Sequence, residues 1–334
     1  MKNLKRFFFL FSASSMLLLA GCGSSETPSS GDDSRIHAVT TIFPQYDFLR
    51  QIGGEHLEVT MLLKPGAESH SFEPTPADMI TVSESDLFVY VGGDSDAWVD
   101  TILESVDTSE KEIVTLMDCV ETVAEEEAEG METHGHAHDH EAEENEADSE
   151  AEHADDSHAE QDEHVWTSPR NAILIVEKLC DALVRIDPEH AADYRNNTEA
   201  YLEQLQALDE EFQETVNHAE RRTIVLGERF PFRYLADAYG LDYYAAFPGC
   251  SSESEASAKT VAFLINKVKE EQIPVVFTIE LSNDKMTDSI CEATGAKKLL
   301  LHSCHNVTKE DFEQGVTYLD LMEHNVQVLK EALN

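Results

Sequence analysis

Basic residues are scarce in this chain. Its 334 residues include 23 Lys or Arg against 67 Asp or Glu, and the formal net charge is −44. Nucleic acids are bound through a basic surface, so this charge excludes them and other acidic partners and favours cations. Nineteen of the acidic residues, with no Lys or Arg among them, lie between Glu121 and Glu163.

The N-terminal apolar run is too short to cross a bilayer. It extends from Phe7 to Ala20 after three basic residues, whereas a spanning helix needs roughly 20 apolar residues. A basic start and a short apolar run are typical of an export signal. The run ends in LAGC, which resembles a bacterial lipobox with cleavage before Cys22 and lipidation of its thiol; the alternatives are a plain signal peptide or a buried helix.

Cysteines are few beyond Cys22, and their number is odd. The five are Cys119, Cys180, Cys250, Cys291 and Cys304. Outside the cell, an odd number leaves at least one free thiol. Cys119 and Cys180 are expected to be buried and inert. Cys250 and Cys304 each follow an apolar run, and a disulfide between them is one pairing that the sequence leaves open.

Strand-like and helical stretches alternate from residue 35 onward. This alternation predicts an α/β fold with parallel sheets covered by helices on both faces. The first half has strands expected at 36–42, 57–63, 86–93 and 112–117, and helices at 45–54, 77–85 and 97–106. The second half has strands expected at 222–227, 242–247, 274–280 and 296–302, and helices at 230–240, 257–272, 283–295 and 315–333.

Between the two halves, helical pattern covers residues 168–186 and then runs from about residue 191 to 219. Ser168 is expected to cap the first helix, with Pro169 in its first turn. The second helix would be long enough to join two α/β lobes. There is no internal sequence repeat, only repeated architecture.

The expected organisation therefore has six parts. They are a signal peptide (1–21), a flexible tether (22–34), an N-terminal α/β lobe (35–120), a disordered acidic His-rich loop (121–163), the end of that lobe with the connecting helix (164–219), and a C-terminal α/β lobe (220–334). The tether and the loop have no apolar periodicity and cannot form a core.

Candidate metal ligands follow the expected strands. Ligands of open parallel sheets bind beyond the carboxyl ends of the strands, and His70, Glu228, His302 and His305 lie there. His164 lies where the acidic run meets the connecting helical region. Three imidazoles and a carboxylate from this set would suit a first-row divalent cation and favour Zn²⁺. Each residue alone could instead be an ordinary loop or helix-end residue. No HExxH-like motif is present.

Four segments resemble the zinc and manganese ABC-transporter substrate-binding lipoproteins. KPGAESHSFEPTPADM and DEHVWTSP are similar to the segments that carry two N-lobe ligands, although Ser168 replaces an Asp. GERFPFRYLADAYGL is similar to the third-ligand segment, and GVTYLDLMEHNVQVLKEAL resembles the closing helix. The resemblance covers almost the whole mature chain. It implies two α/β lobes, a rigid connecting helix and a metal site in the cleft between the lobes.

The resemblance also implies which residues bind the metal. His70 and His164 match the N-lobe ligands, and Glu228 occupies the third position, where zinc members have His and manganese members often have a carboxylate. His305, with His302 as the alternative, stands where members usually carry Asp. The resulting His₃–carboxylate set favours Zn²⁺, with Mn²⁺ as the alternative.

The family also places a His-rich loop before the second ligand. Six histidines of the acidic run are therefore expected to capture metal weakly: His134, His136, His138, His140, His153 and His158. The alternative is a solvated linker whose histidines have no essential role.

The expected function is capture of Zn²⁺ outside the cytoplasm and its delivery to an ABC permease and its ATPase. The protein would be a monomer held at the cell membrane by its lipid anchor, and not an enzyme. A zinc-buffering adhesin is an alternative. A zinc hydrolase is a less favoured alternative, because it would need an open coordination position and a general base.

Overall fold

The computed structural model describes residues 35–67, 72–132, 161–251 and 256–334. Residues Arg35–Asn334 form one compact unit. Within the described residues, every helix is too short or too polar to cross a membrane.

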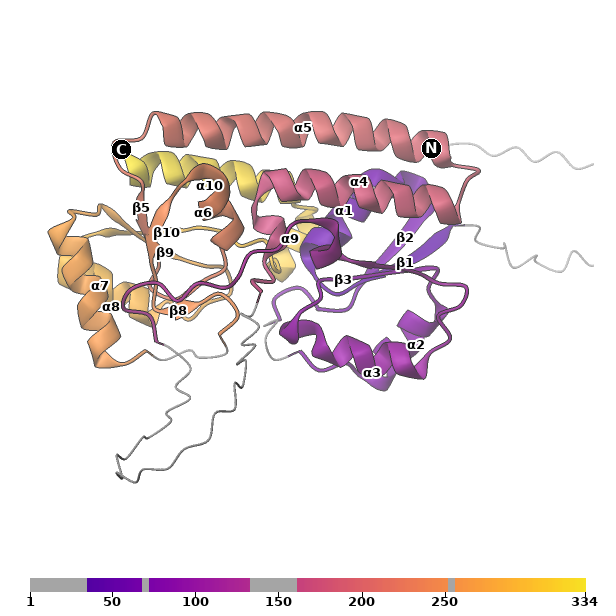
Figure 1. The fold of residues 1–334 in the computed structure, drawn as a ribbon, viewed down its shortest axis with the longest axis horizontal. Helices are drawn as coiled ribbons and strands as arrows, with labels where there is room; N and C mark the ends of the chain where they lie inside the picture. The colour runs from indigo at the N-terminus through magenta and orange to yellow at the C-terminus, as the bar shows by residue number, and fades with distance from the viewer. Residues whose placement is uncertain (1–34, 68–71, 133–160, 252–255) are drawn as a thin grey trace, which may run out of the picture. The chain divides into compact units, whose positions relative to one another are not determined.

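The first half of the unit is a four-stranded parallel sheet in the order β2-β1-β3-β4. Its strands are β1 (Ile36–Thr40), β2 (Leu57–Met61), β3 (Leu87–Tyr90) and β4 (Glu112–Thr115). Its helices are α1 (Phe43–Gly53), α2 (Pro76–Glu84) and α3 (Ala97–Ser105), with short 3₁₀ turns η1 (Gly54–His56), η2 (Asp94–Asp96) and η3 (Leu116–Cys119). Figure 1 shows α1 on one side of this sheet and α2 and α3 on the other.

Alternating side chains of these strands account for the two helical layers. Ala38 joins the cluster that contains Phe48 of α1, whereas the next residue, Val39, packs with Val82 of α2 and Val99 of α3. Successive side chains of a strand point to opposite faces, so a strand that is apolar on both faces must be covered by helices on both.

The second half repeats this arrangement. Its strands are β5 (Thr223–Val225), β7 (Asp242–Tyr244), β9 (Val275–Thr278) and β10 (Lys297–Leu300), and a parallel bridge between Leu226 and Phe277 joins the β5-β7 pair to the β9-β10 pair. The spatial order β7-β5-β9-β10 thus matches the order of the first sheet. The helices are α6 (Arg233–Tyr239), α7 (Ala258–Glu270) and α8 (Lys285–Thr294), and β6 (Arg229–Phe230) pairs with β8 (Phe247–Pro248).

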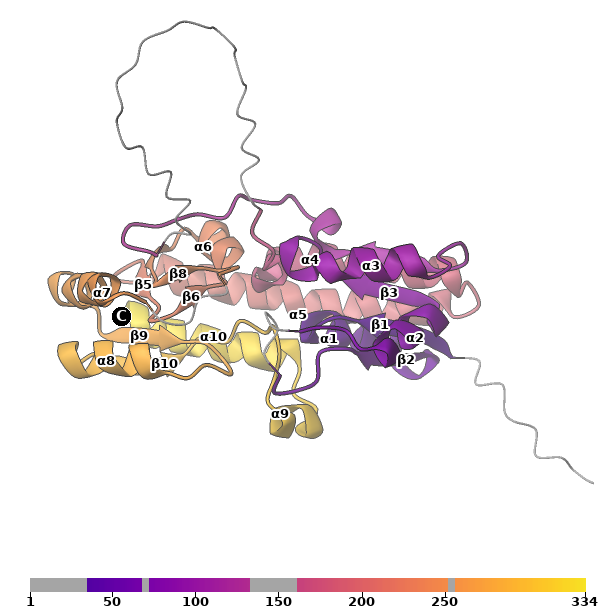
Figure 2. The ribbon, with the colours of Figure 1, turned by 90° about the horizontal axis from the view of Figure 1, so that it is seen from below.

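A helical layer connects the halves. It contains α4 (Pro169–Ile186), α5 (Ala191–Asn217) and α10 (Tyr318–Leu333). The short turn η4 (Val165–Thr167) precedes α4, and the short helix α9 (Lys309–Gln314) precedes α10. The 27 residues of α5 span about 40 Å at 1.5 Å per residue. This helix contacts α1 and α4 of the first half and α6 and α10 of the second, and it passes both sheets in Figures 1 and 2.

The α/β fold with parallel sheets and a long connecting helix, predicted from the sequence, is confirmed. Two details differ. Ser168 stands at the N-cap of α4, but its hydroxyl makes no hydrogen bond within the described residues. The acidic run also does not begin as a separate loop at Glu121. Residues up to Glu132 lie against the second half, because their carboxylates find partners there, among them Ser257 and Thr260 for Glu132.

Candidate metal centre

His164 is held in a buried acidic segment just before η4. It is 2 % exposed, and the neighbouring Asp162 and Glu163 are 1 % and 4 % exposed. The Asp162 carboxylate accepts a hydrogen bond from the backbone N–H of His164 at 2.8 Å and lies 3.1 Å from its Nδ1. A carboxylate on one ring nitrogen sets the orientation of a histidine and increases the basicity of its other nitrogen, as is common for metal-ligating histidines.

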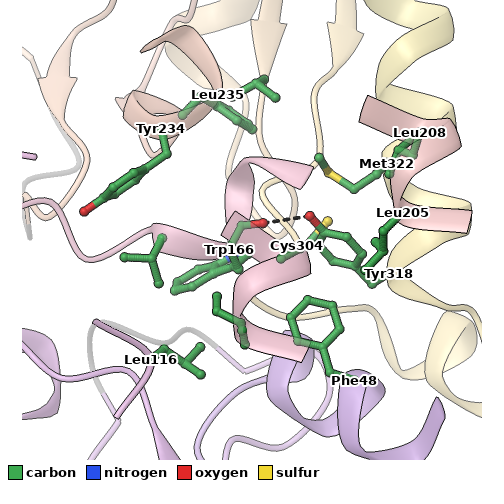
Figure 3. Packing of buried hydrophobic residues seen from close by; sticks show 14 of the residues in the cluster. Phe48, Leu116, Trp166, Leu205, Leu208, Tyr234, Leu235, Cys304, Tyr318 and Met322 are labelled. Carbon is green, nitrogen blue, oxygen red and sulfur yellow. Dashed lines mark hydrogen bonds between the residues drawn. The ribbon is translucent and has the colours of Figure 1, made fainter. Parts of the chain in front are cut away.

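Trp166 connects His164 to the second half of the protein. Its indole N–H donates to the carbonyl of Ser303 at 2.8 Å, and its own carbonyl accepts from the hydroxyl of Tyr318 at 2.7 Å. Figure 3 shows this second bond among the buried side chains around Cys304 and Phe48. The Trp166 ring lies 5.4 Å from the ring of His164 and 5.1 Å from that of His305 between centroids.

His305 and Glu280 come from the second half. The Glu280 carboxylate accepts hydrogen bonds from the backbone N–H groups of Ser303 (2.8 Å) and His305 (3.1 Å) and from the Ser303 hydroxyl (2.5 Å). The rings of His305 and His164 lie 5.8 Å apart between centroids. Two imidazoles from distant parts of the chain are therefore close to one another, and the Glu280 carboxylate contacts the backbone beside one of them.

The three side chains line one pocket. Its wall contains His164, Glu280 and His305, together with Arg229 and Asn306. A second hollow, lined among others by Asp96 and Glu163, shares His164 and His305 with the first. Imidazole nitrogens and carboxylate oxygens are the donors that zinc accepts in proteins, so the lining has the chemistry of a zinc site. Among the described residues only Asp162, His164 and Cys250 bring three potential ligand atoms within 4.8 Å of one another, so His164, His305 and Glu280 would have to draw closer together around an ion.

Two non-glycine residues beside this pocket have left-handed backbone conformations. Leu281, which follows Glu280, has φ 59°, and Cys304, which precedes His305, has φ 62°. Such conformations are uncommon for residues with a side chain. They cost of order 1–3 kcal/mol and persist where surrounding contacts hold them, often at ligand sites.

Only some of the predicted ligands lie together in the structure. His164 and His305 meet in the pocket. His302, the alternative to His305, does not line it, because its Nδ1 accepts a hydrogen bond from the N–H of Cys304 at 2.9 Å and its backbone pairs with Asn325. Glu228 also lies outside the lining: its carboxylate accepts hydrogen bonds from Ser282 and from Thr278 (3.0 Å).

Some predicted residues lie outside the described part of the chain. These are Cys22, His70 and the six histidines of the acidic run: His134, His136, His138, His140, His153 and His158. Their roles remain predictions.

Glu280 was missed by the sequence reasoning. It lies two residues beyond the end of β9. The strand expected at 274–280 included it, so the rule that selected Glu228 beyond its strand passed over Glu280. The segment after β5 contributes Arg229 to the pocket wall instead of Glu228. Sequence position alone could not decide which of these side chains turns inward.

The disulfide considered between Cys250 and Cys304 is absent, and both are free thiols. Cys304 is completely buried in the hydrophobic cluster of Figure 3. Cys250 is half-buried near Asp162 and His164. Burial raises the pKa of both thiols. Of the cysteines expected to be inert, Cys180 is buried and Cys119 is only partly so, with a pKa raised to about 11, mainly by burial.

Negative charge dominates the surroundings of His164. Burial alone would lower its pKa, but Asp162, Glu163 and Glu125 outweigh burial and raise the pKa above the ordinary histidine value. Burial also raises the pKa of Glu163, and it raises that of Asp96 to about 7. Carboxylates removed from water are stabilised by a nearby cation, so this region favours binding of a positive ion.

Two parallel-sheet halves, a long connecting helix and a pocket of imidazole and carboxylate donors define a metal-binding solute-binding protein. Residues 38–332 match the sequence profile of the family described as "Zinc-uptake complex component A periplasmic". The chain belongs to this family.

Sequence and structural similarity to known proteins supports this assignment. The chain is 32 % identical over 325 residues to the high-affinity zinc uptake system protein ZnuA of Bacillus subtilis, covering 96 % of this chain and 95 % of that protein. It is 30 % identical over 330 residues to the zinc-binding lipoprotein AdcA of Streptococcus pneumoniae, but spans only 61 % of AdcA's length. Among solved structures, the Zn(II)-bound ZnuA-like domain of that AdcA is 27 % identical with a TM-score of 0.70, covering 90 % of this chain and 99 % of the domain.

The two glutamates give a direct test of the pocket. Glu280→Gln should weaken zinc binding by more than the roughly 10- to 100-fold typical of losing a partner outside the first ligand shell, because it removes a charged donor from the pocket wall. Glu228→Gln is the matched control and should leave the affinity close to that of the parent. Competition titration with a chromophoric chelator measures both. A larger loss in Glu228→Gln than in Glu280→Gln would contradict this reading of the pocket.

Proposed function

We propose that this protein is the zinc-binding component of an ABC importer, which captures Zn²⁺ outside the cytoplasm and delivers it to a membrane permease driven by an ATPase. The observation that carries the proposal is the meeting of His164 with His305 and Glu280 in one pocket. Family membership and the zinc-uptake names of its relatives support the choice of cargo.

The proposed ligands are His164, His305 and Glu280, with His70 as the predicted fourth. His164 directly precedes η4 and α4, whereas Glu280 and His305 follow strands β9 and β10 of the second half. Coordination by both groups would couple metal binding to the relative position of the halves, and separating the groups would release the ion. Four protein ligands leave no open coordination position, which disfavours hydrolytic chemistry.

Zinc is favoured over manganese by the donor set. Zn²⁺ accepts four nitrogen and oxygen ligands and binds such sites more tightly than Mn²⁺ in the Irving–Williams order. Mn²⁺ prefers a larger share of oxygen ligands, and the pocket supplies two imidazoles against one carboxylate.

We therefore expect one tightly bound Zn²⁺ per chain and weaker binding of Mn²⁺. Because the pKa of His164 is raised, protons compete with zinc already at or above the ordinary histidine pKa of about 6.5, and the affinity should decrease as the pH falls through that range. Competition titrations with both metals between acidic and neutral pH, and metal analysis of the purified protein, measure these effects. Tighter binding of Mn²⁺ than of Zn²⁺ would overturn the assignment of the cargo.

The His-rich run is proposed as an accessory metal collector. Its six histidines are expected to bind weakly, since the composition of the run predicts no core and each capture would cost ordering entropy. Deleting residues 133–160, and keeping the packed residues up to Glu132, should preserve the tight site while lowering the total zinc bound. Equilibrium dialysis at low and high zinc separates the two classes of site. Loss of the tight site in the deletion variant would show that the run belongs to it.

The lipid anchor is also a proposal. The lipobox at Cys22 would hold the mature chain at the outer face of the cytoplasmic membrane, where a permease could receive its metal. Cys22→Ala should abolish lipidation and leave unprocessed or released protein. Mass spectrometry and membrane fractionation measure this, and an unchanged mass with unchanged membrane partitioning would reject the anchor.

A further inference from the structure

A second group of metal-binding side chains adjoins the pocket. Asp162, His164 and Cys250 place one potential ligand atom each within 4.8 Å of one another. Asp162 and Cys250 do not line the proposed zinc pocket. The group therefore shares only His164 with that pocket and differs from it in containing a thiol.

The geometry of this group is close to that of a zinc site. Bond lengths of about 2.0–2.1 Å to nitrogen or oxygen and about 2.3 Å to sulfur place tetrahedral ligand atoms roughly 3.3–3.6 Å apart. Asp162 Oδ1 and His164 Nδ1 are already 3.1 Å apart. All three ligand atoms lie within 4.8 Å of one another, so a movement of Cys250 Sγ by at most about 1 Å would complete three ligands.

Backbone contacts hold the three side chains together. The N–H of Cys250 donates to the Glu125 carboxylate at 2.8 Å, which fixes the cysteine beside the acidic segment. At the preceding Gly249, an added Cβ would lie 3.2 Å from both Asp162 Oδ2 and His164 Cε1 and 2.8 Å from the carbonyl oxygen of Phe230. The absence of a side chain at Gly249 thus lets this loop approach the Asp162–His164 pair closely.

The charge around the group also favours a cation. Asp162 and Glu163 are almost completely buried, and Glu125 adds a third carboxylate that acts on both His164 and Cys250. Buried carboxylates are costly unless a positive charge is close. Arg229 lies in the neighbouring wall, where its guanidinium donates to the carbonyl of Ser251 at 3.2 Å.

We propose that Asp162, His164 Nδ1 and Cys250 form a second zinc position, which holds the ion before it moves to the pocket of His164, His305 and Glu280. On binding, zinc forms a bond to Cys250 Sγ and displaces the thiol proton to water. The proton on the His164 ring then resides on Nε2. This step rests on the proposed function, because the ion it transfers is the cargo.

The two positions are alternatives and are not filled together. A neutral imidazole has one nitrogen that accepts and one that carries a proton, so His164 binds zinc through Nδ1 or through Nε2 but not through both. Cys250 is half-buried, whereas Asp162 and His164 are buried. The thiol is therefore the most accessible of these three ligands, and an ion held there reaches the pocket through a change of the His164 nitrogen that binds it.

Cobalt is the probe for this position, because a thiolate bound to Co²⁺ gives a near-ultraviolet charge-transfer band that nitrogen and oxygen ligands do not give. The experiment uses the full chain with His305→Ala, which weakens the main pocket, under a phosphine reductant. Titration with Co²⁺ should produce the band. Adding Cys250→Ser, which keeps the side-chain size, should abolish it and weaken Co²⁺ binding by about tenfold or more. Adding Cys291→Ser, a partly exposed thiol on α8, is the matched control and should leave the band intact.

Kinetics on the otherwise unchanged protein give a second readout. Cys250→Ser should slow zinc loading in stopped-flow measurements, whereas the control Cys291→Ser should load zinc at the rate of the parent. Absence of the charge-transfer band, or a band that survives Cys250→Ser, would overturn the second position even if the parent binds zinc tightly. If the parent protein itself does not bind zinc tightly, the proposed function is refuted instead.

Discussion

The contacts of Trp166 are the constraint on which the metal pocket depends. Its indole N–H and its backbone carbonyl join the segment of His164 to Ser303 and Tyr318, and its ring contacts the imidazoles of both His164 and His305. The two histidines are 141 positions apart in the chain. One buried aromatic side chain therefore contacts both proposed ligands, which the backbone alone would leave independent. It does so in a hydrophobic cluster where water does not compete for its hydrogen bonds.

Electrostatics gives that pocket its preference for cations. Asp162 and Glu163 are buried beside His164, and Glu125 lies near them. Their charge raises the pKa of His164, so the same carboxylates that attract a metal ion also attract the protons that compete with it. Zinc affinity is consequently expected to decrease as the pH falls, because protons compete for His164.

The repeated architecture explains how two halves can present ligands to one another. Both sheets are parallel and have the same strand order, and the carboxyl ends of parallel strands lie along one edge of a sheet. Glu280 and His305 follow β9 and β10 at such an edge. The long helix α5 contacts helices of both halves, which limits how far the halves can separate when a ligand is exchanged.

The sequence by itself predicted most of the elements and named candidate ligands. Apolar alternation and strand–helix order predicted the parallel sheets and α5, because these patterns depend on local periodicity. The positions of His164 and His305 followed from family motifs and strand ends. Only the tertiary structure decided that Glu280 lines the pocket, whereas Glu228 accepts a hydrogen bond from Ser282. It also showed that the ring of His302 accepts a hydrogen bond from the N–H of Cys304. Cys250 lies beside Asp162 and forms no disulfide with Cys304. The physical reason is that a loop side chain takes its direction from hydrogen bonds and packing with residues far away in the chain, and local sequence carries no record of those contacts.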